Sequence, residues 1–390
     1  MYVGGYSAET SNDSNWAVVK YSSAGAQLWE ARYGGAAGGF DALYDMKVNF
    51  NTGDVYATGK SVESGSVYSV YTTIKWNRNG VLQWVAHYNG YQSTAWAIDI
   101  DSQGNSYVTG DSNESKTLIA TVKYNSSGIQ QWVARYSVGA AQSRYGVVAD
   151  ALGNIYVTGW TDLTNYPDRH YVTIKYNSQG VEQWHQVYGG TSEPSDIVLD
   201  GSGNVYVTGA SLSGFYPHGY LTVKYNPAGG QLWAASYEGA GNGQDQAEDI
   251  AYDPVTNTVL VTGSSFDSPT TSSYVTIKYD VNLGGAIWTA DYAGLANFGG
   301  GNAIAVDGAG NIYVTGGSVE SGIGYDYATV KYNRNGVQRW SVTYDGGIGN
   351  DYGLAIAAAN SGNIYVTGTS GTTNGGTIGD EYATIKYSQP

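Results

Sequence analysis

Short apolar runs alternate with turns rich in Gly and Asn along the whole chain. The apolar residues do not recur at the three- and four-residue spacing of an amphipathic helix. The stretch from Asn302 to Tyr344 shows the pattern and contains four such runs. They are Ala303 to Asp307, Ile312 to Gly316, Tyr327 to Tyr332, and a last run that carries Trp340 and Tyr344. Runs of this length between turn formers are typical of β-strands. The pattern therefore predicts a unit of four strands.

Two kinds of turn separate these strands. A Gly-Asn pair such as Gly310-Asn311 follows the first strand and tolerates the positive φ that tight hairpins require. An Asn-x-x-Gly segment such as Asn333 to Gly336 follows the third strand and suits a type I turn that ends in a left-handed glycine. Because both connections are tight, we expect the strands to be antiparallel neighbours.

A Trp-x-x-x-Tyr pair marks the fourth strand and recurs about every 52 residues, close to the period of four-stranded propeller blades. We expect these tryptophans to form the structural core of the repeats; they are Trp29, Trp84, Trp132, Trp184, Trp233, Trp288 and Trp340. The fold class predicted is all-β, a β-propeller of about seven four-stranded blades. A superhelical β-solenoid is the alternative.

The residues of one repeat carry a family resemblance. The stretch Asp200 to Gly209, followed by Tyr220 to Tyr225 and Trp233, resembles the SBBP-type β-propeller repeat of bacteria and archaea, a relative of the NHL repeat. The resemblance covers nearly the whole chain and implies blades around an axis, usually in secreted or surface proteins. It implies no catalytic residues, because the matching positions are turn and core positions.

The strand patterns do not divide evenly into blades. First and fourth strands each occur seven times, whereas second and third strands occur eight times, which gives 30 strands. We predict a single β-propeller domain over residues 1–390, in which residues 1–33 and 353–390 are incomplete terminal blades. If Gln27 to Tyr33 closes the last blade, a two-stranded hairpin is left over. An eighth, imperfect blade is the alternative.

Incomplete blades predict an interaction between copies of the chain. Open strand edges pair readily with another chain, and a head-to-tail contact builds a filament unless it closes on itself. The expected partner is therefore the chain itself, in a filament or surface layer, and closure within one chain is the alternative. The assembly strands are expected to use Tyr2, Val3, Trp16, Val18, Lys20, Tyr21, Tyr382, Ile385 and Tyr387.

Charge and composition narrow the function. Acidic residues outnumber basic ones 33 to 18, which argues against nucleic acid as a partner. No apolar run is long enough for membrane insertion, and Met1 to Gly5 lacks the segments of a signal peptide. The chain has no Cys. The location is implied by the resemblance and not by these features, and it is that of an extracellular or cell-surface protein of a prokaryote.

Candidate chemistry is sparse. No hydrolase, zinc-protease or phosphate-loop motif is present, so we expect no catalytic residue, no cofactor and no metal. An enzyme that uses paired carboxylates stays a third possibility, and the acidic residues concerned are Asp41, Asp196, Asp245, Glu248 and Asp351. The Asp of each Asp-x-x-Gly-Asn segment is expected to cap its own turn.

A lysine recurs once in each third strand, for example Lys75 and Lys331. A series of cations could line an anion channel. We favour a structural role, in which the lysine stem packs on a neighbouring Trp or Tyr and the ammonium lies near a blade carboxylate.

The connections between second and third strands vary most among repeats, so their face is the candidate binding face. Two of these loops contain Pro, aromatic residues and His, and we expect them to stack on a carbohydrate; the residues are Trp160, Tyr166, His170, Tyr216 and His218. Such loops also commonly pack on themselves. The leading hypothesis is a self-assembling structural propeller, and the alternative is a monomeric module that binds carbohydrate or another surface ligand.

Overall fold

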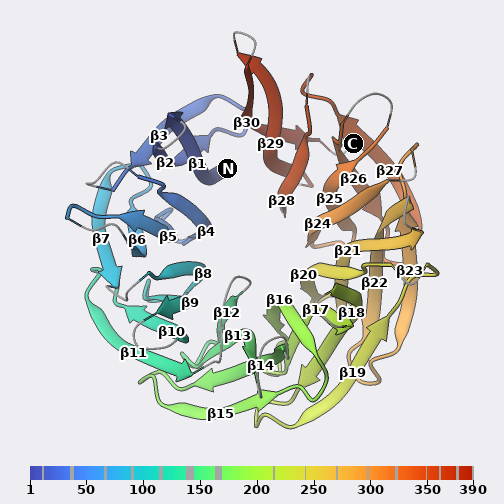
Figure 1. Cartoon of the computed structure of the whole chain (residues 1–390), viewed down its shortest axis with the longest axis horizontal. Coiled ribbons are helices and arrows are strands. Elements are labelled where there is room, and N and C mark those ends of the chain that lie inside the picture. The colour runs from blue at the N-terminus through green and yellow to red at the C-terminus, as the bar shows by residue number, and fades with distance from the viewer. Residues whose placement is uncertain are drawn as a thin grey trace. The chain divides into compact units, whose positions relative to one another are not determined.

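The computed structural model describes residues 1–10, 13–35, 39–65, 68–88, 92–113, 117–137, 145–162, 169–213, 216–241, 243–268, 271–296, 298–320, 324–347, 349–359, 362–374 and 377–388. The chain divides into two compact units, Met1–Gly189 and Gly190–Pro390. Both units consist of antiparallel sheets that follow one another in chain order (Figure 1). Each unit is described by itself below.

The first unit contains one three-stranded and three four-stranded sheets among its described residues, in the hydrogen-bonded orders β1-β2-β3, β4-β5-β6-β7, β11-β10-β9-β8 and β12-β13-β14-β15. Their bounds are β1 (Tyr2–Thr10), β2 (Asp13–Tyr21), β3 (Gln27–Tyr33), β4 (Ala42–Val48), β5 (Val55–Val62), β6 (Ser69–Trp76), β7 (Leu82–Tyr88), β8 (Thr94–Ile100), β9 (Ser106–Asn113), β10 (Thr117–Tyr124), β11 (Gln130–Ser137), β12 (Gly146–Ala149), β13 (Ile155–Asp162), β14 (Arg169–Tyr176) and β15 (Glu182–Val187).

The second unit contains three four-stranded sheets and ends with a three-stranded one, β28-β29-β30. Its strands are β16 (Ser192–Leu199), β17 (Val205–Ser213), β18 (Tyr216–Tyr225), β19 (Gln231–Tyr237), β20 (Gln246–Asp253), β21 (Thr258–Ser268), β22 (Thr271–Asp280), β23 (Ala286–Tyr292), β24 (Gly299–Val306), β25 (Ile312–Ser318), β26 (Asp326–Tyr332), β27 (Gln338–Tyr344), β28 (Tyr352–Ala358), β29 (Ile364–Asn374) and β30 (Thr377–Tyr387).

The all-β propeller fold is confirmed, with eight blades rather than about seven. The described residues hold the expected 30 strands. The difference arises at β3, which pairs with β2 in the register Lys20↔Trp29 and does not complete another blade. The tight turn between β2 and β3 keeps the entropy cost of this pairing low. That residues 1–390 form one domain stays a prediction.

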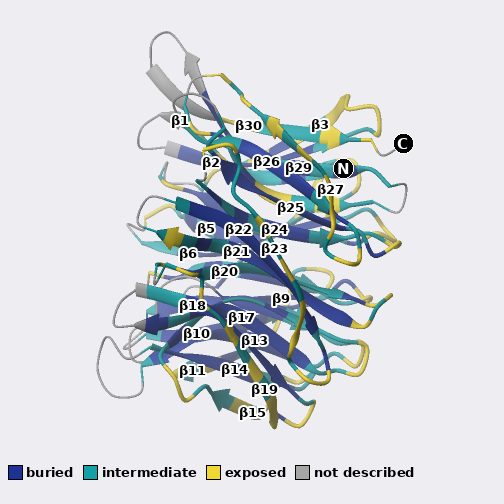
Figure 2. Ribbon diagram, turned by 90° about the vertical axis from the view of Figure 1, so that its right-hand side faces the viewer, coloured by how far each residue is buried: buried dark blue, intermediate teal, exposed yellow. Residues whose placement is uncertain are grey.

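Burial follows the position of a strand within its sheet. Within each unit the first strand of one sheet packs against the first strand of the next, as β4 does with β8 and β20 with β24. Second and third strands are covered on both faces, so that β25 is buried along its whole length, whereas the fourth strand β27 is largely exposed. Figure 2 shows buried strands in dark blue and exposed turns in yellow.

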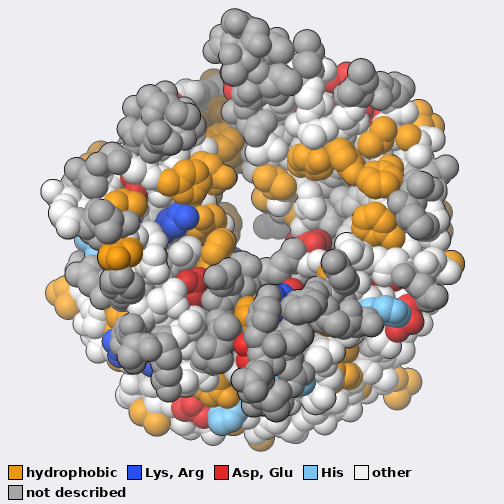
Figure 3. Space-filling model, in the orientation of Figure 1, with side chains coloured by type: hydrophobic (Ala, Val, Ile, Leu, Met, Phe, Trp, Pro, Cys, Tyr) orange, Lys and Arg blue, Asp and Glu red, His pale blue; other side chains and the backbone are white. Residues whose placement is uncertain are grey.

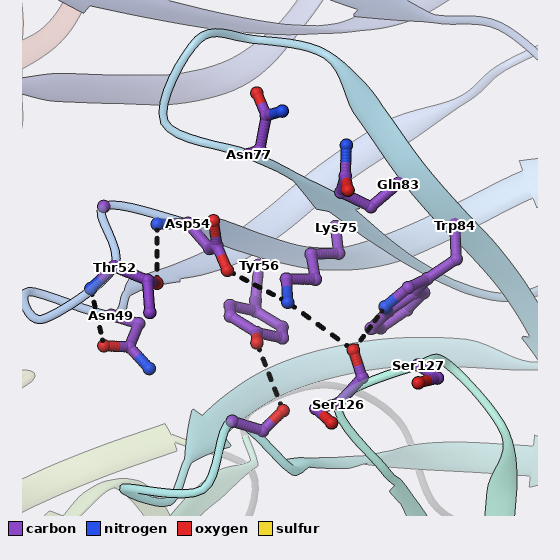
Figure 4. Close-up of polar contacts among 12 residues, drawn as sticks. Asn49, Thr52, Asp54, Tyr56, Lys75, Asn77, Gln83, Trp84, Ser126 and Ser127 are labelled. Carbon is purple, nitrogen blue, oxygen red and sulfur yellow. Dashed lines mark hydrogen bonds and ion pairs between the residues drawn. The ribbon is translucent and has the colours of Figure 1, made fainter.

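The tryptophan of a fourth strand fastens its sheet to the next sheet of the same unit. The indole Nε1 of Trp84 donates a 3.1 Å hydrogen bond to the carbonyl oxygen of Ser126 in the following Asn-x-x-Gly turn (Figure 4). The glycine of that turn, Gly128, has φ +79°, and a Cβ there would lie 2.6 Å from Cδ2 of Trp84. Glycine is therefore required both by the backbone and by the indole. The same donor bond joins Trp29 to Arg78, Trp132 to Ser178, Trp233 to Val281 and Trp288 to Arg334.

The repeated lysine lies beside this tryptophan. The Nζ of Lys75 is 5.0 Å from the ring centroid of Tyr56 and donates to the same Ser126 carbonyl oxygen at 3.5 Å (Figure 4). The expected packing on an aromatic ring is thus confirmed. The expected contact with a carboxylate is seen in some repeats. The Nζ of Lys75 lies 3.0 Å from a carboxylate oxygen of Asp54, and that of Lys278 lies 3.8 Å from one of Asp253. The partner that recurs from repeat to repeat is instead a backbone carbonyl oxygen. Lys20, Lys123 and Lys224 likewise donate to a backbone carbonyl oxygen, so a carboxylate is not needed to satisfy the ammonium in these repeats.

The aspartate of the Asp-x-x-Gly-Asn turns caps its own turn, as predicted. Oδ1 of Asp200 accepts the backbone N–H of Ser202 and Asn204, and Oδ2 accepts the side chains of Asn204 and Tyr206. Burial alone would raise the pKa of Asp200, but these hydrogen bonds lower it below its usual value.

Candidate ligand-binding site

One position in the second strands differs sharply between the two units. The residue after the Thr-Gly pair is small in the second unit, where it is Ala210, Ser264, Gly317 and Thr369. In the first unit the same position holds Tyr6, Lys60, Asp111 and Trp160. The preceding glycine lies against the first strand, and a Cβ on Gly59 would meet the backbone oxygen of Ala42. The large side chains of the first unit therefore follow directly after a glycine at which the first and second strands are closely packed.

Two β-bulges bring further aromatic side chains to this region of the first unit. The pairing of β4 with β5 shifts between Leu43 and Asp45, and that of β8 with β9 shifts between Ala95 and Ala97. The extra residues are Tyr44 and Trp96. Bulges re-aim side chains, and here the two rings lie 4.3 Å apart between centroids with an interplanar angle of 32°.

Trp96 is held by a carboxylate on the neighbouring strand. Its Nε1 donates a 2.6 Å hydrogen bond to Oδ1 of Asp111. Burial raises the pKa of Asp111 to about 6, while the bond from Trp96 and the charge of Lys60 oppose this change. Burial also lowers the pKa of Lys60, against the attraction of Asp111 and Asp41. Lys60 and Asp111 thus act on each other electrostatically, with Asp111 buried and Lys60 half-buried.

A second aromatic pair lies on the other side of Lys60. The Nζ of Lys60 is 4.8 Å from the ring centroid of Phe40, and the ring of Phe40 meets that of Tyr6 at 5.4 Å. Tyr6 and Phe40 are 43% and 48% exposed. Burial, followed by the electrostatic action of Tyr6 and Asp111, raises the pKa of Tyr44 to about 12.

We call these six residues the aromatic site: Tyr6, Phe40, Tyr44, Lys60, Trp96 and Asp111. They come from three successive sheets and the connection before β4. On the face drawn in Figure 3, hydrophobic side chains gather around a basic one over the region of β4 and β5. Partly exposed aromatic rings around a few polar groups are typical of small-molecule binding sites.

The loop residues predicted in the first unit lie away from solvent where they are described. Trp160 is 3% exposed, and the guanidinium of Arg169 lies 4.8 Å from its ring centroid. His170 is on the adjacent strand, and its Nδ1 lies 3.0 Å from the carbonyl oxygen of Tyr188. Tyr166 lies outside the described residues. The structure thus brings Trp160 and His170 onto paired strands of one sheet.

The other two loop residues are in the second unit, at the start of β18. The backbone of Tyr216 pairs with Ser213, and Nδ1 of His218 lies 3.7 Å from a carboxylate oxygen of Glu238. A ligand site at these loops stays a prediction.

Three of the carboxylates considered for catalysis hold loops in place. Oδ2 of Asp245 accepts the backbone N–H of Gly239, while Oδ1 accepts the hydroxyl of Ser265 and the N–H of Phe266. Asp41 and Asp351 occupy equivalent places and each accepts two backbone N–H groups. All three are buried. These contacts stabilise the connections on either side of each carboxylate.

An acidic cluster in the second unit was not foreseen. Oxygens of Asp326, Asp345 and Asp351 lie within 4.8 Å of one another, a spacing that could hold a metal ion. Burial, followed by the neighbouring carboxylates, raises the pKa of Asp326 to about 6. Both oxygens of Asp351 are already engaged by Gly346 and Gly371, so this group contributes little free ligand capacity.

Sequence reasoning missed the aromatic site, although a signal for it exists. Aligning the repeats at Thr-Gly shows Lys60 and Asp111 where later repeats carry small residues. The bulges that present Tyr44 and Trp96 have no such signal, because a bulge depends on how two strands pair.

Comparison with known proteins supports the fold. Residues 131–167 match the family described as SBBP, a β-propeller repeat, which confirms the resemblance to this repeat over that segment. Among curated proteins, none matches the chain. No helix in the described part of the chain is long and apolar enough to cross a membrane.

Several solved structures share the fold at low sequence identity. A quinohemoprotein alcohol dehydrogenase from Pseudomonas putida is 12% identical with a TM-score of 0.56, over 95% of this chain and 72% of that one. The periplasmic gluconolactonase PpgL from Pseudomonas aeruginosa is 12% identical with a TM-score of 0.56, over 88% and 95%. Sqt1 from Chaetomium thermophilum is 9% identical with a TM-score of 0.54, over 84% and 80%. At these identities the likeness concerns the fold alone.

Proposed function

We propose that this protein is a non-catalytic binding module, located outside a prokaryotic cell, that binds carbohydrate at the aromatic site. The observation that carries the proposal is the arrangement of four aromatic rings around the Lys60–Asp111 pair. The rings offer apolar faces for the C–H groups of a sugar, and the pair offers a donor and an acceptor for its hydroxyl groups. The contacts among these side chains place them before a ligand binds, which reduces the entropy cost of binding.

The surroundings of Asp111 support binding rather than hydrolysis. Glycoside hydrolysis needs two carboxyl groups free to act on the bond. The carboxylate that acts with Asp111 on Lys60 is Asp41, and both oxygens of Asp41 accept backbone N–H groups. Asp111 itself accepts the bond from Trp96.

The proposal is tested by a glycan array followed by calorimetry. We expect a carbohydrate signal that Trp96→Ala and Lys60→Met each reduce at least about tenfold, the effect of losing one good contact. Phe50→Ala is the control, because Phe50 is 94% exposed in the turn after β4 and lies outside the aromatic site. An empty array, or a signal that Trp96→Ala leaves unchanged, contradicts the proposal. If the combined change of Tyr166, His170, Tyr216 and His218 to Ala removes the signal instead, the loops are the site.

Self-association is the second candidate, and the sheet topology favours it. Among the described residues, strand β1 has the sequence of a second strand and pairs with β2 alone, whereas the equivalent β5 pairs with both β4 and β6. Strand β30 has the sequence of a third strand, and within the same described part of the chain it pairs with β29 alone. Both edges carry backbone groups to which a strand from a second copy could bond.

Light scattering coupled to gel filtration tests self-association. We expect the full chain to form head-to-tail assemblies, and we expect deletion of residues 1–23, which removes β1 and β2, to return it to a monomer. A full chain that stays monomeric at high concentration, or assemblies that the deletion leaves unchanged, would contradict self-association through these strands. Neither result would bear on the carbohydrate-binding proposal.

A further inference from the structure

The aromatic site contains two platforms rather than one. The first is the exposed pair of Tyr6 and Phe40, whose rings meet edge to face at an interplanar angle of 65°. The second is the tilted stack of Tyr44 and Trp96. Lys60 links the platforms, because its ammonium lies over Phe40 while its charge acts on Asp111, which in turn binds Trp96.

We propose, on the basis of the function inferred above, that the aromatic site binds a neutral oligosaccharide of at least two sugar units. One unit packs on Tyr44 and Trp96, and the next unit packs on Tyr6 and Phe40. Lys60 and Asp111 bind hydroxyl groups between the two units. The ligand is therefore a chain, and a single sugar fills only half of the site.

The contacts of each platform support an extended ligand. The rings of Tyr44 and Trp96 cover part of each other, which leaves outer faces and edges for contact. Lys60 occupies one face of Phe40, so a sugar on the first platform meets the remaining surface of Phe40 and the exposed ring of Tyr6. Each platform is too small to bind strongly alone, and linking two contacts in one ligand raises the affinity.

Charge determines that the ligand is neutral. Lys60 is the basic group of the site, and Asp111 and Asp41 both already attract it. Asp41 is fully buried next to the site, and the chain carries a net charge of −15. An acidic sugar would meet one compensated cation in a field of negative charge, and this field would repel it.

Calorimetry with defined sugars tests the inference on the full chain. The probes are glucose and N-acetylglucosamine, the disaccharides and tetrasaccharides of the malto, cello and chito series, and tetragalacturonate. In at least one neutral series we expect the tetrasaccharide to bind at least about tenfold more tightly than its monosaccharide, as the gain of a second aromatic contact allows. Tetragalacturonate is expected to show no binding.

Variants then assign the two platforms. Phe40→Ala should weaken tetrasaccharide binding at least about tenfold more than monosaccharide binding, since the longer ligand loses one of its two contacts. Trp96→Ala should weaken both. Phe50→Ala should change neither, and a circular dichroism melt checks that each variant is folded.

The outcomes separate the inference from the proposed function. Equal affinities for monosaccharide and tetrasaccharide that are sensitive to Trp96→Ala would mean a single sugar subsite, which overturns the inference and leaves the function standing. Tighter binding of tetragalacturonate than of the neutral sugars overturns the neutral assignment. No binding of any sugar here and on the array overturns the proposed function itself.

Discussion

The indole Nε1 of Trp96 and Oδ1 of Asp111 are 2.6 Å apart and join a bulged first strand to the second strand beside it. This hydrogen bond to a charged group fixes the plane of the indole against Tyr44. Because Asp111 also interacts with Lys60, one carboxylate orders both an aromatic ring and a cation. The preorganised aromatic site depends on this contact.

The first prediction concerns the effect of pH on stability through Asp111. Its pKa is raised to about 6 in the folded protein, so the folded state favours the protonated carboxyl. This stabilisation is fully present below the unfolded pKa of about 4 and is lost as the pH rises through about 6. The groups that interact with Asp111 include Trp96, Lys60 and the hydroxyls of Tyr44, Tyr71 and Tyr145.

Asp111→Asn removes this titration and keeps an acceptor for Trp96. Relative to the variant, the wild type should lose about 2 kcal/mol of unfolding free energy between pH 4.5 and pH 7.5, because most of the shift of roughly two pKa units is expressed in this range. Urea unfolding at several pH values measures the difference. Parallel stability profiles for the two proteins would show that Asp111 has an ordinary pKa.

The second prediction concerns the glycine of the Asn-x-x-Gly turns. Gly180 has φ +78°, and a Cβ there would lie 2.6 Å from Cδ2 of Trp132; Gly25 has φ +86° but no neighbour within 4 Å of an added Cβ. Gly25→Ala should therefore cost about 1 kcal/mol through the backbone alone. Gly180→Ala should cost at least about 1 kcal/mol more, because the indole must move. Equal losses in thermal unfolding would contradict the role given to the indole contact.

The third prediction concerns the tryptophan itself. Trp132 is partly exposed, so Trp132→Ala should cost about 3 kcal/mol, the lower end of the range for buried aromatic residues. Trp132→Phe keeps most of the ring but loses the bond to Ser178, and should cost about 1 kcal/mol. Chemical denaturation of both variants provides the measurement. If the alanine variant keeps the wild-type midpoint, the contact between the sheets is not stabilising.

The fourth prediction concerns the buried loop carboxylate Asp245. In Asp245→Asn the amide nitrogen must face one of the donors Gly239, Ser265 or Phe266, which leaves a buried donor without a partner. We expect a loss of about 2 kcal/mol. Asp267→Asn, on an exposed carboxylate, is the control and should have little effect. A similar small effect for both variants would argue against the structural role of Asp245.

The repeated strands could be predicted because each depends on local sequence. The alternating pattern and the turn residues are enough to locate 30 strands, and the cap formed by Asp200 lies within a few residues of its partners. The number of blades could not be predicted in the same way. It depends on whether Gln27–Tyr33 pairs with the neighbouring β2 or with a distant strand, a competition that the pattern alone does not decide.

The alignment of the repeats marks Lys60 and Asp111, but the full set of residues in the aromatic site could not be predicted, because they are far apart in sequence. Lys60 and Asp111 belong to successive repeats and come within electrostatic reach of each other through the packing of the two sheets. Phe40 lies in the connection before β4, whose path a repeat pattern does not define. Residue type and loop position predict that Trp160 and His170 bind a ligand. Both side chains are buried in the structure, and this burial limits what each of them can contact.

A crystal structure of the protein soaked with the tightest-binding neutral tetrasaccharide tests the central claim most directly. The account predicts one sugar unit against Tyr44 and Trp96, a second unit against Tyr6 and Phe40, and hydroxyl groups within hydrogen-bonding distance of Lys60 and Asp111. Sugar density at the loops that carry His170 or His218, with the aromatic site empty, would contradict it.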